Sequence, residues 1–592
     1  MAARAILVAT LGAAAAALVL PTAAITAASP AAPAVTVSPL PGTPDASART
    51  QISFLGGPGA RVESVSAVGS RSGRHAGRIE EYSTGDGASF LPNRPFSAAE
   101  TVRVTAVVAD DGATATQRTT FTVATQAHVD RAGFPPQAGD RAAVQHYLSA
   151  PTLSPSTVRI TTAAAPRATA GDLFFAPYQG SGDPGPMITD QRGNLIWFHR
   201  LLPGQLATDF HPQRLGDRTV LTWWQGQILA LGFGLGVDEV YSASYRPLAV
   251  VHAGNGYSAD LHEFLLEPDG TAWLDAFDPV EVDLRRLGGS RHAVVSDSVV
   301  EEIDTRTGLV MWEWHALGHI PLADSYSEMP HGSHAWDYAH INSIDPGGGG
   351  QLLLSSRNTS ALWDVSRASG RIVWTLGGRH STFAQSPGTR FDFQHDAEWQ
   401  PDGRVSLFDN GYVVTHDTPS RGLVLDPQIS THTVRLIERF ANPTVKLQTM
   451  SQGDLLRLPG SNWLVGYGGL PNFTEFDGSG QVLLDGALGP FVQSYRTYLA
   501  QWSARPDTRP AVAAQLTATG MDVEASWNGA TDVASWEVLA GTTEGSLAPV
   551  ATAPATGFET TLHVGQARYL AVAARDRRGA VLATSGPISP GG

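Results

Sequence analysis

Three histidines in separate stretches of the chain share one register relative to a turn. Each of His262, His340 and His395 lies eight residues before a glycine of a turn, and Gln452 lies eight residues before Gly460. Equivalent positions in successive repeats lie at one height around a common axis, so we expect the three imidazoles to converge. Imidazoles gathered at one point can bind an anion, ligate a metal, or act as a nucleophile or base.

A second set of polar residues is expected at the same end of these hairpins. The return strand brings Arg357 toward His340, and it brings Asp409 and Asn410 toward His395. Strand alternation places Asn342 on the same side as His340. An arginine and an asparagine beside several imidazoles favour a site for a tetrahedral oxyanion.

A metal centre is the first alternative. His262, His340 and His395, with Asp260 or Asp396, are legitimate ligands for zinc or iron. However, no HxH or HExxH spacing occurs, and an arginine at the same place disfavours a cation. We therefore expect no metal. A non-catalytic binding protein on the same scaffold stays open, because fold alone does not decide function.

The elements that must position these residues repeat along the middle of the chain. One phrase ends in an apolar strand after a turn, as in MITDQRGNLIWFHR and EEIDTRTGLVMWEW. A second phrase is a hairpin that interleaves with the first, as in HEFLLEPDGTAWL and HDAEWQPDGRVSLFDN. Two such phrases per unit, about 50 to 80 residues apart, are typical of propeller blades with four strands. Residues 166–505 are predicted to form a six-bladed β-propeller.

The flanking segments predict an all-β protein throughout. Residues 33–125 alternate apolar and polar positions between turns, which predicts an immunoglobulin-like β-sandwich. A stretch rich in proline and alanine, residues 126–165, is predicted to link it to the propeller. Residues 510–592 resemble a fibronectin type III module, where we expect no chemistry.

Composition excludes several classes of function. The net charge of −15 argues against a nucleic-acid partner, since phosphate binding needs a basic face. The 592 residues include no cysteine, which excludes thiol catalysis and thiolate metal sites. It also argues against a quinone-dependent dehydrogenase, whose cofactor platform uses vicinal cysteines.

The first residues predict export. Residues 1–28 combine one arginine with an apolar run and small residues near Ala24 and Ala28, which is typical of a cleavable signal peptide. No later stretch is apolar enough to span a bilayer. We expect a secreted, extracellular protein without a membrane span. A homodimer stays open.

Several motifs resemble the arylsulfotransferase family, in its actinobacterial and fungal branch. They are DLHEF, EEIDTRTG, HINS, LLLSSR, QHDAEW and SLFDN, in the expected order. The resemblance covers about residues 166–500 and extends into the N-terminal sandwich through GSRSGRHAG. The C-terminal module is an addition to the minimal family plan.

The resemblance implies a fold and an activity. Members are six-bladed propellers that move a sulfuryl group from a phenolic sulfate donor to a phenolic acceptor, without a 3′-phosphoadenosine cofactor or any other. By motif, the histidine that becomes transiently sulfated falls on His395, and the supporting histidines fall on His262 and His340. The family's sulfate-binding asparagine and arginine fall on Asn342 and Arg357.

The chemistry of a sulfate ester fits these residue types. Positive donors around the sulfate oxygens match the charge that develops during transfer, and only a neutral imidazole can attack sulfur. Asp396 or Glu398 is expected to orient His395. Two alternatives stay open, namely a sulfate-ester hydrolase on the same site and a binding or adhesion propeller without turnover.

Aromatic side chains are candidates for stacking on the aryl ring of a substrate. The candidates in the sequence are Trp223, Trp224, Trp336 and Tyr338. Packing in the propeller core or at its rim is at least as good an interpretation of all four.

Overall fold

The computed structural model describes residues 35–110, 113–330, 334–411 and 418–590, and these residues form an all-β protein. The predicted signal peptide lies outside them. The described part of the chain holds only short 3₁₀ turns as helices, at Arg141–Ala143, Arg285–Leu287, Leu322–Asp324, Pro387–Thr389 and Pro459–Ser461. None of these is long or apolar enough to cross a membrane.

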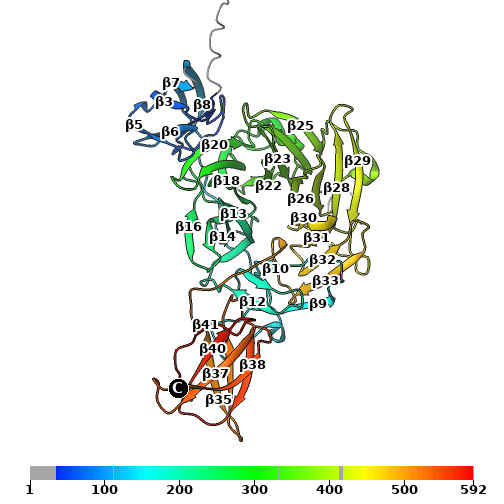
Figure 1. Cartoon of the computed structure of the whole chain (residues 1–592). Coiled ribbons are helices and arrows are strands. Elements are labelled where there is room, and N and C mark those ends of the chain that lie inside the picture. The colour runs from blue at the N-terminus through cyan, green and yellow to red at the C-terminus, as the bar shows by residue number, and fades with distance from the viewer. Residues whose placement is uncertain (1–34, 111–112, 331–333, 412–417, 591–592) are drawn as a thin grey trace, which may run out of the picture.

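Six sheets follow one another around a ring in the middle of the chain (Figure 1). In spatial order, the first three are β12 (Leu195–Phe198), β11 (Met187–Thr189), β10 (Asp172–Phe175) and β34 (Thr497–Ala500); β13 (Leu206–Leu215), β14 (Arg218–Ile228), β15 (Gly234–Ser242) and β16 (Pro247–Val251); and β17 (Phe264–Leu266), β18 (Thr271–Val282), β19 (Ala293–Asp304) and β20 (Leu309–His315), with β21 (Trp336–Asp337) beside β19.

The other three sheets complete the ring. They are β22 (Ile341–Asp345), β23 (Gln351–Ser356), β24 (Ala361–Ser366) and β25 (Ile372–Gly377); β26 (His395–Trp399), β27 (Val405–Asp409), β28 (Arg421–Gln428) and β29 (Thr433–Phe440); and β30 (Asp454–Arg457), β31 (Trp463–Gly466), β32 (Asn472–Phe476), β33 (Val482–Leu488) and β9 (Val158–Thr162). This arrangement is propeller-like.

The two ends of the ring are joined by strand pairing. β34 comes from the end of the ring segment and pairs antiparallel with β10 from its beginning. β9 enters before the ring and pairs with β33, the outermost strand of the last sheet. Because β34 completes the first sheet, backbone hydrogen bonds hold the two ends of the ring segment together.

Burial differs between strands that are covered on both faces and strands that have one face toward water. All seven residues of β20, LVMWEWH, are buried, because neighbouring sheets cover both of its faces. In β7 (Thr101–Asp110), burial alternates, with Val102, Val104 and Val108 buried between exposed or half-buried polar residues. That period of two is expected for a strand with one face on a core and one toward water.

Two further groups of sheets flank the ring at opposite ends of the molecule (Figure 1). The N-terminal group pairs β1 (Thr36–Ser38), β2 (Ile52–Leu55), β6 (Gly87–Pro92) and β5 (Gly77–Glu81), and pairs β4 (Gly73–His75), β3 (Arg61–Gly69), β7 and β8 (Ala113–Thr122). The C-terminal group pairs β35 (Ala511–Leu516), β36 (Met521–Ser526) and β39 (Glu559–Val564), and pairs β38 (Ala548–Pro554), β37 (Ser535–Gly541), β40 (Tyr569–Arg575) and β41 (Val581–Thr584).

Both flanking groups pack on the ring through apolar contacts. Leu40, Leu55 and Tyr82 of the N-terminal group share one buried cluster with Trp273 and Trp314 of the third sheet. At the other end, Phe558 joins the cluster of the first and last ring sheets. Burial of this apolar surface stabilises both junctions.

Candidate active site

The first strands of successive ring sheets bring the three predicted histidines to one cavity. His395 begins β26, His340 directly precedes β22, and His262 lies two residues before β17. The cavity has a volume of about 610 Å³, and its wall includes these three histidines and Arg357. That volume is in the range of small-molecule sites, roughly 300–1,000 Å³.

His262 and His340 are adjacent, and a carboxylate supports each of them. Their ring centroids are 4.7 Å apart, with the planes nearly perpendicular. The Nδ1 atom of His340 lies 2.5 Å from Asp337 Oδ2, and Nδ1 of His262 bonds the Asp260 carboxylate. Because the carboxylates occupy Nδ1, Nε2 is the ring nitrogen left for a ligand on both histidines.

His395 is held in one tautomer. Its Nδ1 lies 2.8 Å from Asn410 Oδ1 and 3.1 Å from the Phe393 carbonyl, and both oxygens can only accept a hydrogen bond. The backbone N–H of Gln452 donates to Nε2 at 3.1 Å. The proton therefore sits on Nδ1, and Nε2 carries the lone pair.

The surroundings of His395 keep the ring neutral. Burial lowers its pKa well below the usual value, and the charges of Arg357 and His262 lower it further. Burial also lowers the pKa of His262, although Asp260 opposes that effect. Neutral imidazoles with a defined lone pair can act as nucleophile or proton acceptor.

Arg357 supplies the fixed positive charge of the cavity. Its guanidinium carbon lies 4.2 Å from the centroid of the Phe393 ring, and its NH2 group donates to the Met450 carbonyl at 3.0 Å. NH1 donates to Asn358 Oδ1 at 2.7 Å. These contacts fix the planar group in the wall of the cavity, where it can face an oxyanion.

Asn342 does not take the position that alternation predicts. It is absent from the described wall of the cavity, and its side-chain amide donates to the Gln394 carbonyl at 2.8 Å. The pairing of β22 with β23 shifts register between Ile341 and Ser343, so strict alternation fails at this residue. In this structure Asn342 supports the backbone that leads into His395.

The carboxylates next to His395 in sequence also point elsewhere. The pairing of β26 with β27 shifts register after His395, and Asp396 has a left-handed φ of 54°. Asp396 accepts from the Leu455 N–H at 2.9 Å and lies 3.2 Å from Arg496. Asn410, rather than Asp396 or Glu398, orients His395.

Tyr495, which the sequence analysis did not identify, lines the cavity, and Arg496, also not identified, follows it in the chain outside the described wall. The Tyr495 ring lies edge-on to His262 and His395, with centroids 5.4 and 6.3 Å away. Arg496 is 4% exposed and faces a buried group of acids, with contacts of 3.2 Å to Asp209, 2.9 Å to Glu263 and 3.2 Å to Asp396. The two residues precede β34 just as Gln452 precedes β30, a register signal that could have found them.

The aromatic lining of the cavity differs from the predicted candidates. Trp223, Trp224, Trp336 and Tyr338 lie in the buried clusters of the sheets, not in the cavity wall. Its aromatic residues are Phe134, Tyr178 and Tyr495. Phe134 and Gln137 belong to the predicted linker, so that segment contributes to the wall.

One part of the site has the donor set for a cation. Ligand atoms of Asp260, His262 and Asp275 all lie within 4.8 Å of one another. Most of these atoms already have donors, since Asp260 accepts from the Gly234 N–H and from His262, and Asp275 Oδ1 accepts from the Glu263 N–H at 3.2 Å. Within the described residues, Asp275 Oδ2 is the buried oxygen of this group without a hydrogen bond.

Comparisons with solved structures give only distant matches. A protein of unknown function from Bacteroides caccae is 14% identical, with 55% of this chain and 98% of that chain covered and a TM-score of 0.34. A catalytically inactive variant of virginiamycin B lyase from Staphylococcus aureus, with quinupristin, is 10% identical over 62% and 95% of the two chains, with a TM-score of 0.27. These scores are too low to support an argument.

Comparisons of sequence identify the family. No curated protein matches the chain at a significant level. The family model described as arylsulfotransferase (ASST) matches residues 211–489, which include His262, His340, Arg357 and His395. This segment of the chain matches the arylsulfotransferase family.

Proposed function

We propose that this protein is a secreted enzyme that moves a sulfuryl group from a phenolic sulfate ester to a phenolic acceptor, without a 3′-phosphoadenosine cofactor. The transfer passes through a sulfohistidine on His395. One observation carries this proposal. His395 lines the cavity as a buried, neutral imidazole whose lone pair is on Nε2, and Arg357 lines the same cavity.

The proposal extends to the architecture. The ring sheets are the six blades of a propeller over residues 166–505, to which the preceding segment adds the strand β9, and an immunoglobulin-like sandwich (33–125) and a fibronectin type III-like sandwich (510–592) flank it. Residues 126–165 join the first sandwich to the propeller, and residues 1–28 are a signal peptide. N-terminal sequencing of protein recovered from the medium of a native host tests the last point, since the mature chain is expected to begin near residue 29.

In the first step, Nε2 of His395 attacks the sulfur of the donor. The N–S bond forms as the S–O bond to the aryl group breaks, and the phenolate leaves with the electron pair of that bond. The attack replaces the hydrogen bond from the Gln452 N–H, which is worth only about 1 kcal/mol net. The Nδ1 proton stays on the ring, where Asn410 accepts its hydrogen bond.

The positive side of the cavity binds the sulfate oxygens. Arg357 offers a planar pair of donors. Asp260 and Asp337 orient the rings of His262 and His340, whose Nε2 atoms donate to the sulfate only when these rings are protonated. Donors fixed before the reaction stabilise charge that develops on these oxygens, typically by about 3–4 kcal/mol for one donor. The apolar part of the wall, with Phe134, receives the aryl ring.

In the second step, the acceptor phenol takes the sulfuryl group from His395. Its oxygen attacks sulfur, the S–N bond breaks, and the electron pair returns to Nε2. The phenol must lose its proton, and His262 is the base placed for it, because burial keeps its pKa below the usual value. The free histidine is then ready for another donor.

The test is turnover of 4-nitrophenyl sulfate by the purified protein, with and without added phenol. We expect nitrophenol release that depends on phenol, and none from His395→Ala. A matched control is His292→Ala, because His292 is an exposed histidine paired with Glu281. A sulfated His395 peptide, trapped without acceptor at alkaline pH, should be found by mass spectrometry.

The other outcomes separate the alternatives. Equal release without phenol, still lost in His395→Ala, would make the protein a sulfate-ester hydrolase. No release with several aryl sulfates, together with retained sulfate binding and no label on His395, would refute the enzyme and favour a binding propeller.

A further inference from the structure

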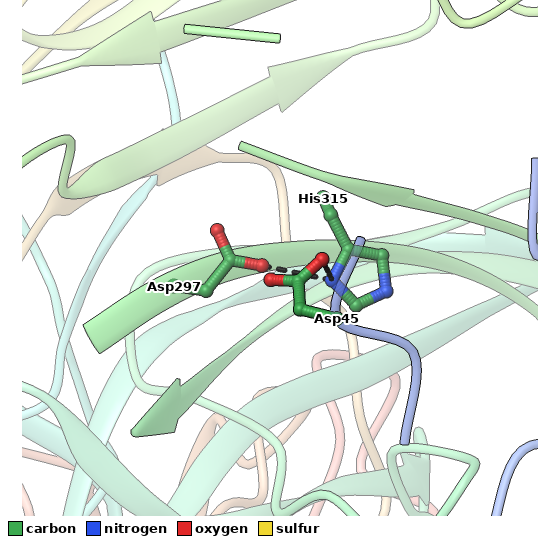
Figure 2. Close-up of side chains that lie close together, drawn as sticks. All are labelled: Asp45, Asp297 and His315. Carbon is green, nitrogen blue, oxygen red and sulfur yellow. Dashed lines mark hydrogen bonds and ion pairs between the residues drawn. The ribbon is translucent and has the colours of Figure 1, made fainter. Parts of the chain in front are cut away.

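A second cluster of titratable side chains lies away from the cavity, where the N-terminal sheets meet the ring. Asp297 is on β19, His315 ends β20, and Asp45 comes from the segment between β1 and β2 (Figure 2). Their exposed fractions are 0%, 1% and 5%. One ligand atom from each residue lies within 4.8 Å of the other two.

The Asp45 carboxylate has no donor of its own. Neither of its oxygens accepts a hydrogen bond within the described part of the chain, and its nearest cationic group is His315 Nδ1 at 3.4 Å. That nitrogen lies closer to Asp297 Oδ2, at 2.8 Å. One Nδ1 proton bonds one acceptor well, so the buried Asp45 carboxyl group is left without a hydrogen bond among the described residues.

More acids crowd the same place. Glu313 Oε1 lies 3.1 Å from His315 Nε2. Asp278 Oδ2 and Glu301 Oε1 are buried and, among the described residues, have no hydrogen-bond partner. Among the described residues, the close ion pairs of Asp45, Asp297 and Glu313 go to His315 alone. Several buried carboxyl oxygens around this imidazole therefore lack a hydrogen-bond donor in the part of the chain described.

The geometry points to a site for one divalent transition-metal ion, bound by Asp45, Asp297 and His315. Such an ion would serve both carboxylates and Nδ1 at once, which a single proton cannot. An imidazole nitrogen with two carboxylates suits zinc or manganese better than magnesium or calcium, which prefer all-oxygen sites.

The surroundings of His315 match those of a metal-bound histidine. A ligating imidazole usually donates its other N–H to a carboxylate, which fixes the tautomer. Here Nε2 lies beside Glu313, leaving Nδ1 to face Asp45 and Asp297 (Figure 2). Asn255 donates to the other oxygen of Glu313 and accepts from the Gln51 N–H at 2.9 Å. Binding would release the Nδ1 proton to water.

The site would join two parts of the chain. Asp45 belongs to the N-terminal sheets, and the other two ligands belong to the third ring sheet. Apart from apolar contacts, that junction has hydrogen bonds such as those from Ser83 to the Asp304 carboxylate, at 2.7 and 2.8 Å. A metal ion at Asp45 would stabilise the docking of the N-terminal sheets on the ring.

The test uses the full chain after removal of metals with a chelator. Zinc and manganese are titrated by calorimetry, and thermal unfolding is followed with and without each metal. We expect one equivalent to bind, the Tm to rise with metal concentration, and the affinity to fall at least about 100-fold in Asp45→Asn and in His315→Gln.

Two control variants and one comparison in chelator make the test specific. Asp304→Asn weakens the same junction without changing a proposed ligand. His262→Gln disrupts the group formed by Asp260, His262 and Asp275. Both variants should therefore still bind one metal ion per chain. In chelator, Asp45→Asn should unfold at the same temperature as the wild type or higher, because it removes a buried carboxyl group that has no hydrogen-bond donor among the described residues.

Three results would overturn the proposal. The first is that the wild type binds neither zinc nor manganese. The second is that Asp45→Asn and His315→Gln both still bind one metal ion per chain. The third is that these two variants bind the metal but His262→Gln does not. Absence of binding together with a lower Tm for Asp45→Asn in chelator would show that Asp45 pairs with a protonated His315.

Discussion

Replacing Arg496 with methionine should destabilise the ring by an amount that depends on pH. Arg496 contacts Asp209, Glu263 and Asp396, all within 3.2 Å, and each of these side chains is less than 10% exposed. Methionine keeps part of the apolar volume and removes the only arginine that pairs with these acids among the described residues. Breaking a buried pair in this way costs roughly 3–5 kcal/mol.

The cost can be worked out from the protons that the acids must take up. Burial already raises the pKa of Glu263, even beside Arg496, so this acid adds least to the penalty. Suppose that the folded variant must hold one further aspartate in its protonated form at pH 7. An aspartate in the unfolded chain has a pKa of about 3.9, so this protonation lowers the free energy of unfolding by about 4 kcal/mol. At pH 5 the same step costs only about 1.5 kcal/mol.

The sign of the pH dependence follows from proton binding. The folded variant holds about one proton more than the folded wild type, while the unfolded chains are nearly equivalent. Lower pH therefore favours the folded variant, and its deficit should shrink by about 1.4 kcal/mol per pH unit between pH 7 and pH 5.

Urea denaturation at the two pH values, followed by tryptophan fluorescence, measures this deficit. Arg435→Met is the matched control, because its side chain is 66% exposed beside Asp426 and its pair should contribute less than about 1 kcal/mol. A penalty for Arg496→Met below about 1 kcal/mol at pH 7, or one that does not shrink at pH 5, would refute the reasoning.

The remaining predictions concern the site itself. Arg357→Gln removes a charge that lowers the pKa of His395, so the acid limb of kcat should move to higher pH in a pH–rate profile. Asn410→Leu removes the nearer of the two acceptors of the Nδ1 proton, so the tautomer is held less firmly and kcat should fall by about 100-fold or more, and an unchanged kcat would contradict this role. Asn342→Ala should raise the donor KM less than Arg357→Gln does, since Asn342 bonds Gln394 outside the cavity wall; equal effects would place Asn342 on the sulfate.

The all-β fold class and the family could be predicted from sequence because both depend on repeated local patterns. Hairpins of equal length put His262, His340 and His395 at matching strand starts, and the structure brings all three to one cavity. Counting from turn glycines works because a strand and its turn occupy the same number of residues in each repeat.

Where local geometry breaks the period of two, sequence reasoning failed. Asn342 and Asp396 both sit at shifts of register, and each turns to a partner that alternation would not choose. Asp396 also has a positive φ, which costs a non-glycine residue about 1–3 kcal/mol and must be held by its surroundings. No alternating pattern shows in advance where such a shift occurs.

The aromatic candidates failed for a different reason. A tryptophan in a propeller strand looks the same in sequence whether it faces a cavity or a neighbouring sheet. Trp223 and Trp224 are buried in the cores, whereas Phe134, which lines the cavity, comes from a segment with no strand pattern. Long-range packing decides this, and it is not encoded in a local window.

Tyr495 and Arg496 explain how a neutral nucleophile can lie so close to buried acids. Carboxylates near an imidazole favour its charged form, and a protonated His395 could not attack sulfur. Arg496 pairs with those acids, and its guanidinium carbon lies 5.4 Å from the centroid of the Tyr495 ring, which is edge-on to His262 and His395. After burial, the leading influences on the pKa of His395 are therefore Arg357 and His262, which both lower it. In the proposed mechanism, Arg496 therefore reduces the effect of these acids on His395. Arg357 stays available to bind the sulfate group.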